Sequence, residues 1–269
     1  MQPCRFKTLH QLPIGRGEQE YRLVFWLPPL LVAPFAGSVA GVMVRRLPAG
    51  RPVGMARSAC DHCNQTLAPR DLIPLISIAL LRGRCRTCGG PIARFHLAIE
   101  LAAVAITLWA ISATRTPSEL WTACGLGWTL LALAWIDAEH LILPDVLTLP
   151  LIIAGLCVTW WLTPAALTAH ALGAIAGYLG FRAIALTYRV LRGREGLGAG
   201  DAKLLAAAGA WVGLAALPDL ILAAGLLGLA VAIAARSPAA RSITVWPPGA
   251  AIPFGPALAL ATFIIRLYR

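Results

Sequence analysis

Two aspartates at the edges of apolar runs are the residues of this sequence best placed to do chemistry. Asp137 ends the first run in LALAWIDAEHLILPDVLTLPLI, and Asp201 follows Gly198 and Gly200 and leads into another run. An ionisable group at membrane depth costs about 2.5–3.5 kcal/mol on insertion scales, so it indicates a functional site. The C-terminal end of a helix also disfavours the charge of Asp137. Asp137 therefore needs a reason other than folding.

A pair of carboxylates supports one particular chemistry, that of an aspartic protease. One carboxyl accepts a proton from water while the other donates a proton to the scissile carbonyl. Like charges 4 Å apart repel by about 4 kcal/mol at an effective dielectric near 20, so such a pair should share one proton. Glycines before Asp201 would permit unusual backbone angles and let an extended peptide approach. Two readings compete: Asp201 as a helix N-cap, and paired acids as the proton relay of a transporter.

The elements that must position these acids are membrane helices. The chain has 269 residues, of which 58% are hydrophobic and 13% charged, whereas soluble proteins have about a quarter charged residues. Apolar runs of bilayer-spanning length recur, and the first run lacks a signal-peptide cleavage site. We expect an all-α polytopic membrane protein with about eight transmembrane helices, at residues 23–44, 95–112, 121–136, 146–163, 165–187, 202–217, 219–235 and 251–267.

Basic residues predict the orientation of these spans. With eight spans, 15 Lys and Arg residues fall on one side, in the segments 45–94, 188–203 and 236–241, and seven fall on the other. The richer side should be cytoplasmic, which places both termini outside. Two spans separate Asp137 from Asp201, so both acids return to the cytoplasmic side. The net charge of +11 needs no nucleic-acid partner, because no basic stripe with interleaved aromatics is present.

The segment between the first two spans, residues 45–94, carries four cysteines as CDHC (Cys60, Cys63) and CRTC (Cys85, Cys88). We call it the cysteine loop. Two CxxC pairs offer the four thiolates that structural Zn²⁺ prefers, and a cytoplasmic loop is too reducing for disulfides. Four unmetallated thiols are the alternative. His62 could act as a ligand, but four cysteines leave it no vacancy.

Other hydrolytic sites have no support in the sequence. The chain contains no HExxH motif and no GxSxG motif, so the ligands of a metalloprotease and the nucleophile elbow of a serine hydrolase are lacking. Asp145 follows Pro144 and precedes an apolar run. We interpret it as the N-cap of the fourth span.

Four segments carry a resemblance to a known family: SACDHC…DLIPLISIALLRGRCRTCGGPI, IDAEHLILPDVLTLP, REGLGAGDAKLLAAAGAWVG and IPFGPALAL. In this order they resemble the prepilin peptidases, or type IV leader peptidases, among the GxGD aspartic proteases. The resemblance implies a multi-pass enzyme of the bacterial inner membrane. It would cleave leaders of type IV pilus prepilins or type II secretion pseudopilins on the cytoplasmic side, after a glycine. It also implies N-methylation of the new N-terminus with S-adenosylmethionine.

Individual positions follow from the resemblance. Asp137 and Asp201 match the catalytic aspartates, whereas Glu195 and Lys203 match motif positions without an assigned role. Glu100 also matches, with burial beside a partner such as Arg94 as the alternative. The S-adenosylmethionine site and the oligomeric state are not predictable from the sequence.

One departure from the family pattern concerns the first span. The family often has Gly-Ser-Phe-Leu-Asn-Val, and Gly41 occupies the asparagine position, so a polar side chain near the cytoplasmic side is lost, a change that bears on methylation and not on proteolysis. The expected organisation is a tail and first helix (1–44), the cysteine loop (45–94) and a multi-helix peptidase region (95–269).

Overall fold

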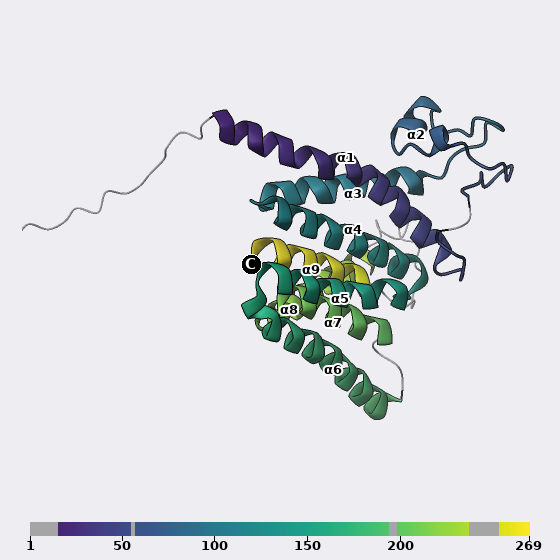
Figure 1. The fold of residues 1–269 in the computed structure, drawn as a ribbon. Helices are drawn as coiled ribbons and strands as arrows, with labels where there is room; N and C mark the ends of the chain where they lie inside the picture. The colour runs from purple at the N-terminus through teal and green to yellow at the C-terminus, as the bar shows by residue number, and fades with distance from the viewer. Residues whose placement is uncertain (1–15, 55–56, 194–197, 237–252) are drawn as a thin grey trace, which may run out of the picture.

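The computed structural model describes residues 16–54, 57–193, 198–236 and 253–269, with residues 16–24, 235 and 236 described by their backbone alone (Figure 1). Eight long helices make up most of this part of the chain. They are α1 (Arg16–Arg46), α3 (Arg94–Ala113), α4 (Pro117–His140), α5 (Asp145–Leu162), α6 (Leu167–Arg192), α7 (Ala199–Val212), α8 (Leu217–Arg236) and α9 (Gly255–Tyr268). A five-residue helix, α2 (Ile76–Leu80), lies in the cysteine loop.

The expected all-α membrane architecture is confirmed. Six helices are long and apolar enough to cross a membrane: α1, α3, α4, α5, α6 and α8. The other two, α7 and α9, have 14 residues each, or about 21 Å at 1.5 Å per residue, which is less than the ~30 Å hydrocarbon core. The described residues contain only two isolated β-bridges and no strand.

Helix α7 is the centre of the bundle. Every residue from Leu204 to Trp211 is buried, because α5, α6 and α9 pack around it. Small residues allow the closest approach: a Cβ added to Gly209 would lie 2.3 Å from the Gly173 carbonyl oxygen of α6. Membrane helices commonly associate through such small residues, since backbones can then touch.

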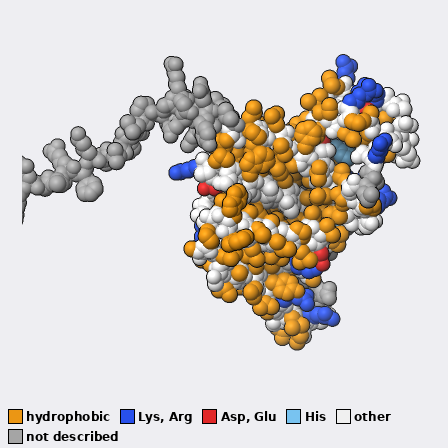
Figure 2. Space-filling model, viewed as in Figure 1, with side chains coloured by type: hydrophobic (Ala, Val, Ile, Leu, Met, Phe, Trp, Pro, Cys, Tyr) orange, Lys and Arg blue, Asp and Glu red, His pale blue; other side chains and the backbone are white. Residues whose placement is uncertain are grey.

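The surface of the bundle is apolar. Figure 2 shows hydrophobic side chains over most of the visible face, with Lys and Arg gathered over the cysteine loop and at the ends of the bundle. Large exposed side chains include Leu179 and Ile184 of α6 and Leu222 of α8. A surface of this kind is suited to lipid rather than water.

Consecutive helices alternate in direction, so the bundle has two distinct ends (Figure 1). One end holds the cysteine loop, the α4–α5 connection and the starts of α7 and α9. The opposite end holds the α3–α4 and α5–α6 connections and the C-terminus. Asp137 and Asp201 both lie at the first end, as the count of spans predicts.

Candidate active site

Asp137 lies in the last turn of α4 and is almost completely buried, with 5% of its surface exposed. The helix ends one turn later at Leu141, which adopts left-handed angles (φ 56°) and donates its N–H to the Asp137 carbonyl oxygen at 2.9 Å. The Asp137 side chain accepts a hydrogen bond from the Gly255 N–H to Oδ2, at 2.8 Å. The first residue of α9 therefore holds one carboxylate oxygen.

Asp201 lies in the first turn of α7 and is partly buried. The N-cap of α7 is Gly198, and no side chain caps the helix, so the alternative of Asp201 as an N-cap is wrong. Asp137 is close enough to act on the Asp201 carboxyl electrostatically. Residues 64 positions apart in the sequence thus come within electrostatic range of each other, because α5 and α6 carry the chain away from this end and back.

Gly255 is a feature that sequence reasoning missed. A Cβ at this position would lie 2.6 Å from Asp137 Oδ2 and 2.8 Å from its Cγ, distances that no side chain tolerates. Only glycine lets the N-terminus of α9, with its partial positive charge, meet the carboxylate directly. The signal was present in IPFGPALAL, where Pro256 follows the glycine, because proline is favoured at the first helical positions.

The glycines before Asp201 do not adopt unusual backbone angles; what matters is that they have no side chain. Gly198 has φ −67° and ψ 143°, an extended conformation open to any residue, so the expected unusual backbone is not observed there. Gly200 is helical, and an added Cβ would lie 2.9 Å from the Leu143 Cβ. The second glycine therefore allows α7 to pack tightly against the α4–α5 connection.

Lys203 and Asp145 form an ion pair across this end of the bundle, with Lys203 Nζ 2.5 Å from Asp145 Oδ1. Asp145 is the first residue of α5, whose N-cap is Pro144 without a side-chain hydrogen bond. The interpretation of Asp145 as an N-cap is therefore wrong, because its carboxylate faces α7 instead. The pair links the helix that follows Asp137 to the helix that carries Asp201.

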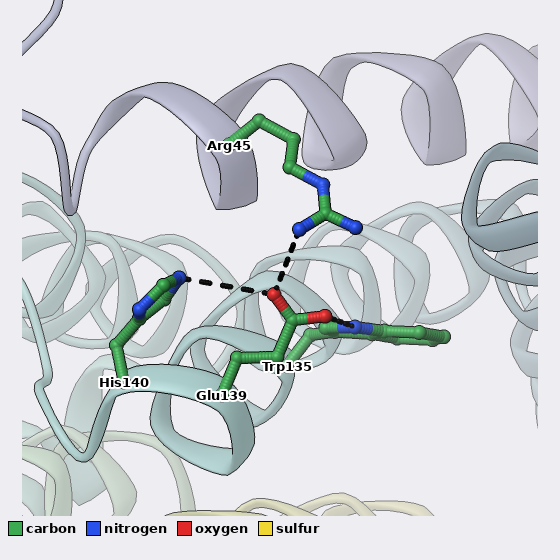
Figure 3. Close-up of polar contacts among 4 residues, drawn as sticks. All are labelled: Arg45, Trp135, Glu139 and His140. Atoms are coloured by element: carbon green, nitrogen blue, oxygen red, sulfur yellow. Dashed lines mark hydrogen bonds and ion pairs between the residues drawn. The ribbon is translucent and has the colours of Figure 1, made fainter. Parts of the chain in front are cut away.

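Glu139 organises a second polar cluster, two residues after Asp137 (Figure 3). Its Oε2 accepts from Arg45 Nη1 at 3.1 Å, and its Oε1 accepts from Trp135 Nε1 at 2.9 Å. His140 Nε2 lies 3.7 Å from the same carboxylate, and the Arg45 guanidinium lies 4.0 Å from the centroid of the Phe95 ring. The cluster fastens α1 and α3 to the end of α4.

Glu100 connects the membrane bundle to the cysteine loop. This residue of α3 is 5% exposed, and its Oε2 accepts a hydrogen bond from the Leu75 N–H at 2.8 Å. Arg94, the suggested partner, is therefore not its hydrogen-bonding partner. Leu75 has φ 61°, a strained value for a leucine that persists only where surrounding contacts hold it.

The four cysteines converge as the spacing predicts. Their sulfur atoms all lie within 4.8 Å of one another, and Cys60 Sγ is 3.9 Å from Cys88 Sγ. Tetrahedral zinc with Zn–S bonds of about 2.3 Å requires sulfurs about 3.8 Å apart. The donor set and its spacing thus fit one zinc ion.

Two equivalent turns build this cluster. Each places a residue with positive φ directly after its second cysteine, Asn64 at 55° and Gly89 at 69°. The backbone N–H groups of Cys88 and Thr87 lower the pKa of the Cys85 thiol to about 6, whereas desolvation and the neighbouring cysteine side chains raise the pKa of Cys88 to about 11. Without a metal ion, the cluster therefore favours a thiolate at Cys85 and not at Cys88. The His62 ring packs 2.9 Å from where a Gly90 Cβ would stand.

Comparison with known proteins agrees with this arrangement. The family described as "Type IV leader peptidase family" matches residues 124–233, and the "Bacterial Peptidase A24 N-terminal domain" matches residues 31–114. A Pseudomonas aeruginosa protein named prepilin leader peptidase/N-methyltransferase is 34% identical over 273 residues, covering 91% of each chain. The chain belongs to the type IV leader peptidase family.

Other family members with the same name are similar over shorter segments. One from Burkholderia pseudomallei (strain K96243) is 46% identical over 189 residues, which cover 70% of this chain. Another, from Dichelobacter nodosus, is 37% identical over 213 residues, which cover 78% of this chain and 71% of the relative. The chain spans only 61% of the length of the Burkholderia relative. A search of solved structures finds no significant match.

The two family segments divide the structure into a part with the cysteine loop and a part with both aspartates. Residues 31–114 cover most of α1, the cysteine loop and α3, while residues 124–233 run from α4 to α8 and include both aspartates. Helix α9, which supplies Gly255, lies beyond both. Glu195, the remaining motif residue, falls outside the described residues.

Gly41, which departs from the family pattern, lies where α1 packs on α3. An added Cβ would be 3.3 Å from Ile99 Cγ2 and 3.6 Å from Phe95 Cε1. A larger side chain here requires the α3 side chains to shift by a few tenths of an ångström. The contact is apolar, and it lies beside the Phe95 ring that supports Arg45.

Proposed function

We propose that this chain is a membrane aspartic endopeptidase that removes the leader peptides of prepilins or pseudopilins. The observation that carries the proposal is the approach of Asp137 to Asp201 at one end of the bundle, with one oxygen of Asp137 fixed by the Gly255 N–H. Paired carboxyls that are shielded from bulk water and share a proton have the composition of a peptide-cleaving dyad.

In the proposed mechanism, the two carboxyls exchange protons with the attacking water and with the peptide bond. The ionised carboxylate takes a proton from a water molecule while the water oxygen attacks the scissile carbonyl carbon. The protonated carboxyl gives its proton to the carbonyl oxygen, which yields a tetrahedral diol. The C–N bond then breaks as the nitrogen gains a proton from the first acid, and a diol hydroxyl returns its proton to the second. Because Gly255 occupies Oδ2 of Asp137, Oδ1 is the oxygen available to water.

The substrate assignment rests on the relatives, which are named prepilin leader peptidase/N-methyltransferase. We place the enzyme in the bacterial inner membrane with the dyad facing the cytoplasm, because the basic segments lie at the dyad end. A cut at this depth suits a substrate whose leader stays outside the bilayer and whose apolar helix lies within it.

N-methylation with S-adenosylmethionine is the second activity that we propose. S-adenosylmethionine would supply the methyl group for the new N-terminal amine. The part of the chain that the structure describes has no glycine-rich loop after a strand, so no residue is assigned to this cofactor. A zinc ion held by the four cysteines would stabilise the cysteine loop, and Glu100 would carry that loop on α3.

Mass spectrometry of a prepilin incubated with the purified enzyme and S-adenosylmethionine tests both activities. Cleavage after the leader glycine, followed by a mass increase of one methyl group, is the expected result. Asp137→Asn and Asp201→Asn should each reduce cleavage by about 10²–10⁴-fold or more, since general acid–base groups contribute on that scale. Circular dichroism would verify that both variants remain folded. Full cleavage by either single variant would contradict the dyad.

A further inference from the structure

A cavity of about 740 Å³ lies at the end of the bundle opposite to the cysteine loop. The end of α3, the start of α4, the α5–α6 connection and the end of α9 enclose it. Its charged and titratable lining consists of Arg115, Glu119, His170, Arg266 and Arg269. Its volume falls within the range of about 300–1,000 Å³ that is usual for ligand sites.

The cavity has an excess of positive charge. Its one acid, Glu119, caps α4: its Oε2 accepts from the backbone N–H of Arg115 at 3.1 Å and of Thr116 at 3.4 Å. Arg269 pairs with Asp219, which lies outside the cavity, at 3.0 Å. Among the residues that the structure describes, neither Arg115 nor Arg266 forms an ion pair, although Glu119 acts on Arg266 electrostatically.

Exposed aromatic residues show at which depth the cavity lies. Trp160 and Trp161 end α5 beside the cavity and are 68% and 73% exposed. Trp121 and Tyr268 are also exposed at this end, at 41% and 64%. Tryptophan and tyrosine gather where lipid headgroups meet the hydrocarbon core. The arginines of the cavity are therefore at headgroup depth.

We propose that this cavity binds the phosphate of an anionic phospholipid headgroup. Arg115 and Arg266 offer planar guanidinium forks that bind phosphate oxygens in pairs. The Ser118 hydroxyl, which shares a hydrogen bond with that of Thr116 at 3.2 Å, also lines the cavity. Basic pockets between membrane helices bind such headgroups on the cytoplasmic side of membranes, and the same attraction between arginine and phosphate applies at the opposite side. The apolar side of the lining, including Leu162, would contact the start of an acyl chain.

The test uses the full chain in detergent, incubated with vesicles of phosphatidylcholine containing phosphatidylglycerol. Native mass spectrometry counts the phosphatidylglycerol molecules that remain bound. The double variant Arg115→Gln/Arg266→Gln should retain phosphatidylglycerol at least about tenfold more weakly than the unaltered chain, because two charge-assisted contacts are lost. Arg192→Gln is the matched control, since it removes one exposed charge at the opposite end.

Several outcomes decide the question. Selective loss in the double variant, with retention in Arg192→Gln, supports the site. Equal retention in all three proteins, or equal loss in both variants, overturns it. Inorganic phosphate that displaces phosphatidylglycerol at equal concentration would assign the cavity to a soluble anion and overturn the lipid assignment. If the double variant does not fold, Arg115→Gln alone serves, because that side chain is exposed.

Discussion

The aspartate site and the cysteine loop lie at the same end of the molecule but are held together differently. Asp137 is surrounded by packed helices, and its carboxylate contacts the backbone of α9 directly. In the cysteine loop, only Pro74, Ser77 and Cys85 are buried between residues 57 and 93. A segment with so little core needs another source of stability, such as a metal ion. Helix packing thus fixes one site, and ligand chemistry is expected to fix the other.

Gly255→Ala should cause the largest loss of activity among single changes that leave both aspartates in place. The added methyl would overlap Asp137 Oδ2 at 2.6 Å, so α9 or the carboxylate must move. Misplacement of a catalytic group by about 1 Å costs on the order of 100-fold in rate. The measurement is the cleavage rate of a prepilin at saturating substrate.

Gly125→Ala is the control for that change. It lies in the same helix as Asp137, and an added Cβ would meet nothing within 4 Å. We expect near-normal cleavage and normal thermal unfolding. An active Gly255→Ala enzyme would show that packing does not fix the aspartate, and would remove the contrast with the cysteine loop.

Removal of zinc should unfold the cysteine loop and leave the bundle intact. Purified protein should contain about one zinc per chain, and Cys85→Ser should lose it, because structural zinc sites need all four ligands. Limited proteolysis should then cut within residues 57–93, while the helical circular dichroism signal stays near its original value. Cys157→Ser, which alters an exposed cysteine outside the cluster, should keep its zinc. If the metal-free protein keeps a protease-resistant cysteine loop, zinc does not stabilise that loop.

Glu100→Ala should have an intermediate effect, because Glu100 joins the two regions. Loss of its carboxylate leaves the partly buried Leu75 N–H without its acceptor, at a cost of about 1–3 kcal/mol. Amide hydrogen exchange around residue 75 should accelerate before the bundle changes. Glu100→Gln keeps an acceptor oxygen and should retain most of the protection; equal exchange in both variants would argue against the hydrogen bond.

The smallest effect is expected for the Lys203–Asp145 ion pair. More than half of the Asp145 side chain is exposed, and exposed pairs are worth about 0–1 kcal/mol. A double-mutant cycle with Lys203→Ala and Asp145→Ala should give a coupling energy in this range from thermal unfolding. Coupling well above about 1 kcal/mol would show that packing does not fix this end without the ion pair.

Sequence patterns predict those parts of this molecule that depend on residues close together in the sequence, such as the bounds of the helices and the spacing of the cysteines. Hydropathy places the long helices within a few residues of most of their bounds, although α1 begins at Arg16 rather than residue 23 and α7 ends at Val212 rather than residue 217. The CxxC spacing predicts the cysteine cluster. The position of Asp137 and Asp201 at the same end of the bundle follows from counting spans, since an even number of crossings returns the chain to the same side.

Contacts that depend on how helices rotate against one another were not predictable. Gly255 meets Asp137 across 118 positions, and Asp145 meets Lys203 across 58. Hydropathy states which residues avoid water but does not state which neighbour each polar group finds. Asp145 shows the consequence: its position before an apolar run is typical of an N-cap, yet its carboxylate faces a lysine of another helix.

The central position of α7 has a consequence for how a substrate of the proposed peptidase would reach the acids. Helices α5, α6 and α9 pack around α7, and Asp201 lies in its first turn, so the acid lies at the end of the bundle and not among the packed flanks of α7. Under the proposed function, the depth of the substrate in the membrane would select the bond that is cut, because only a peptide link near the end of the substrate's lipid-embedded helix would reach the acids. Moving that link inward by two helical turns should protect the substrate even if every neighbouring residue is kept.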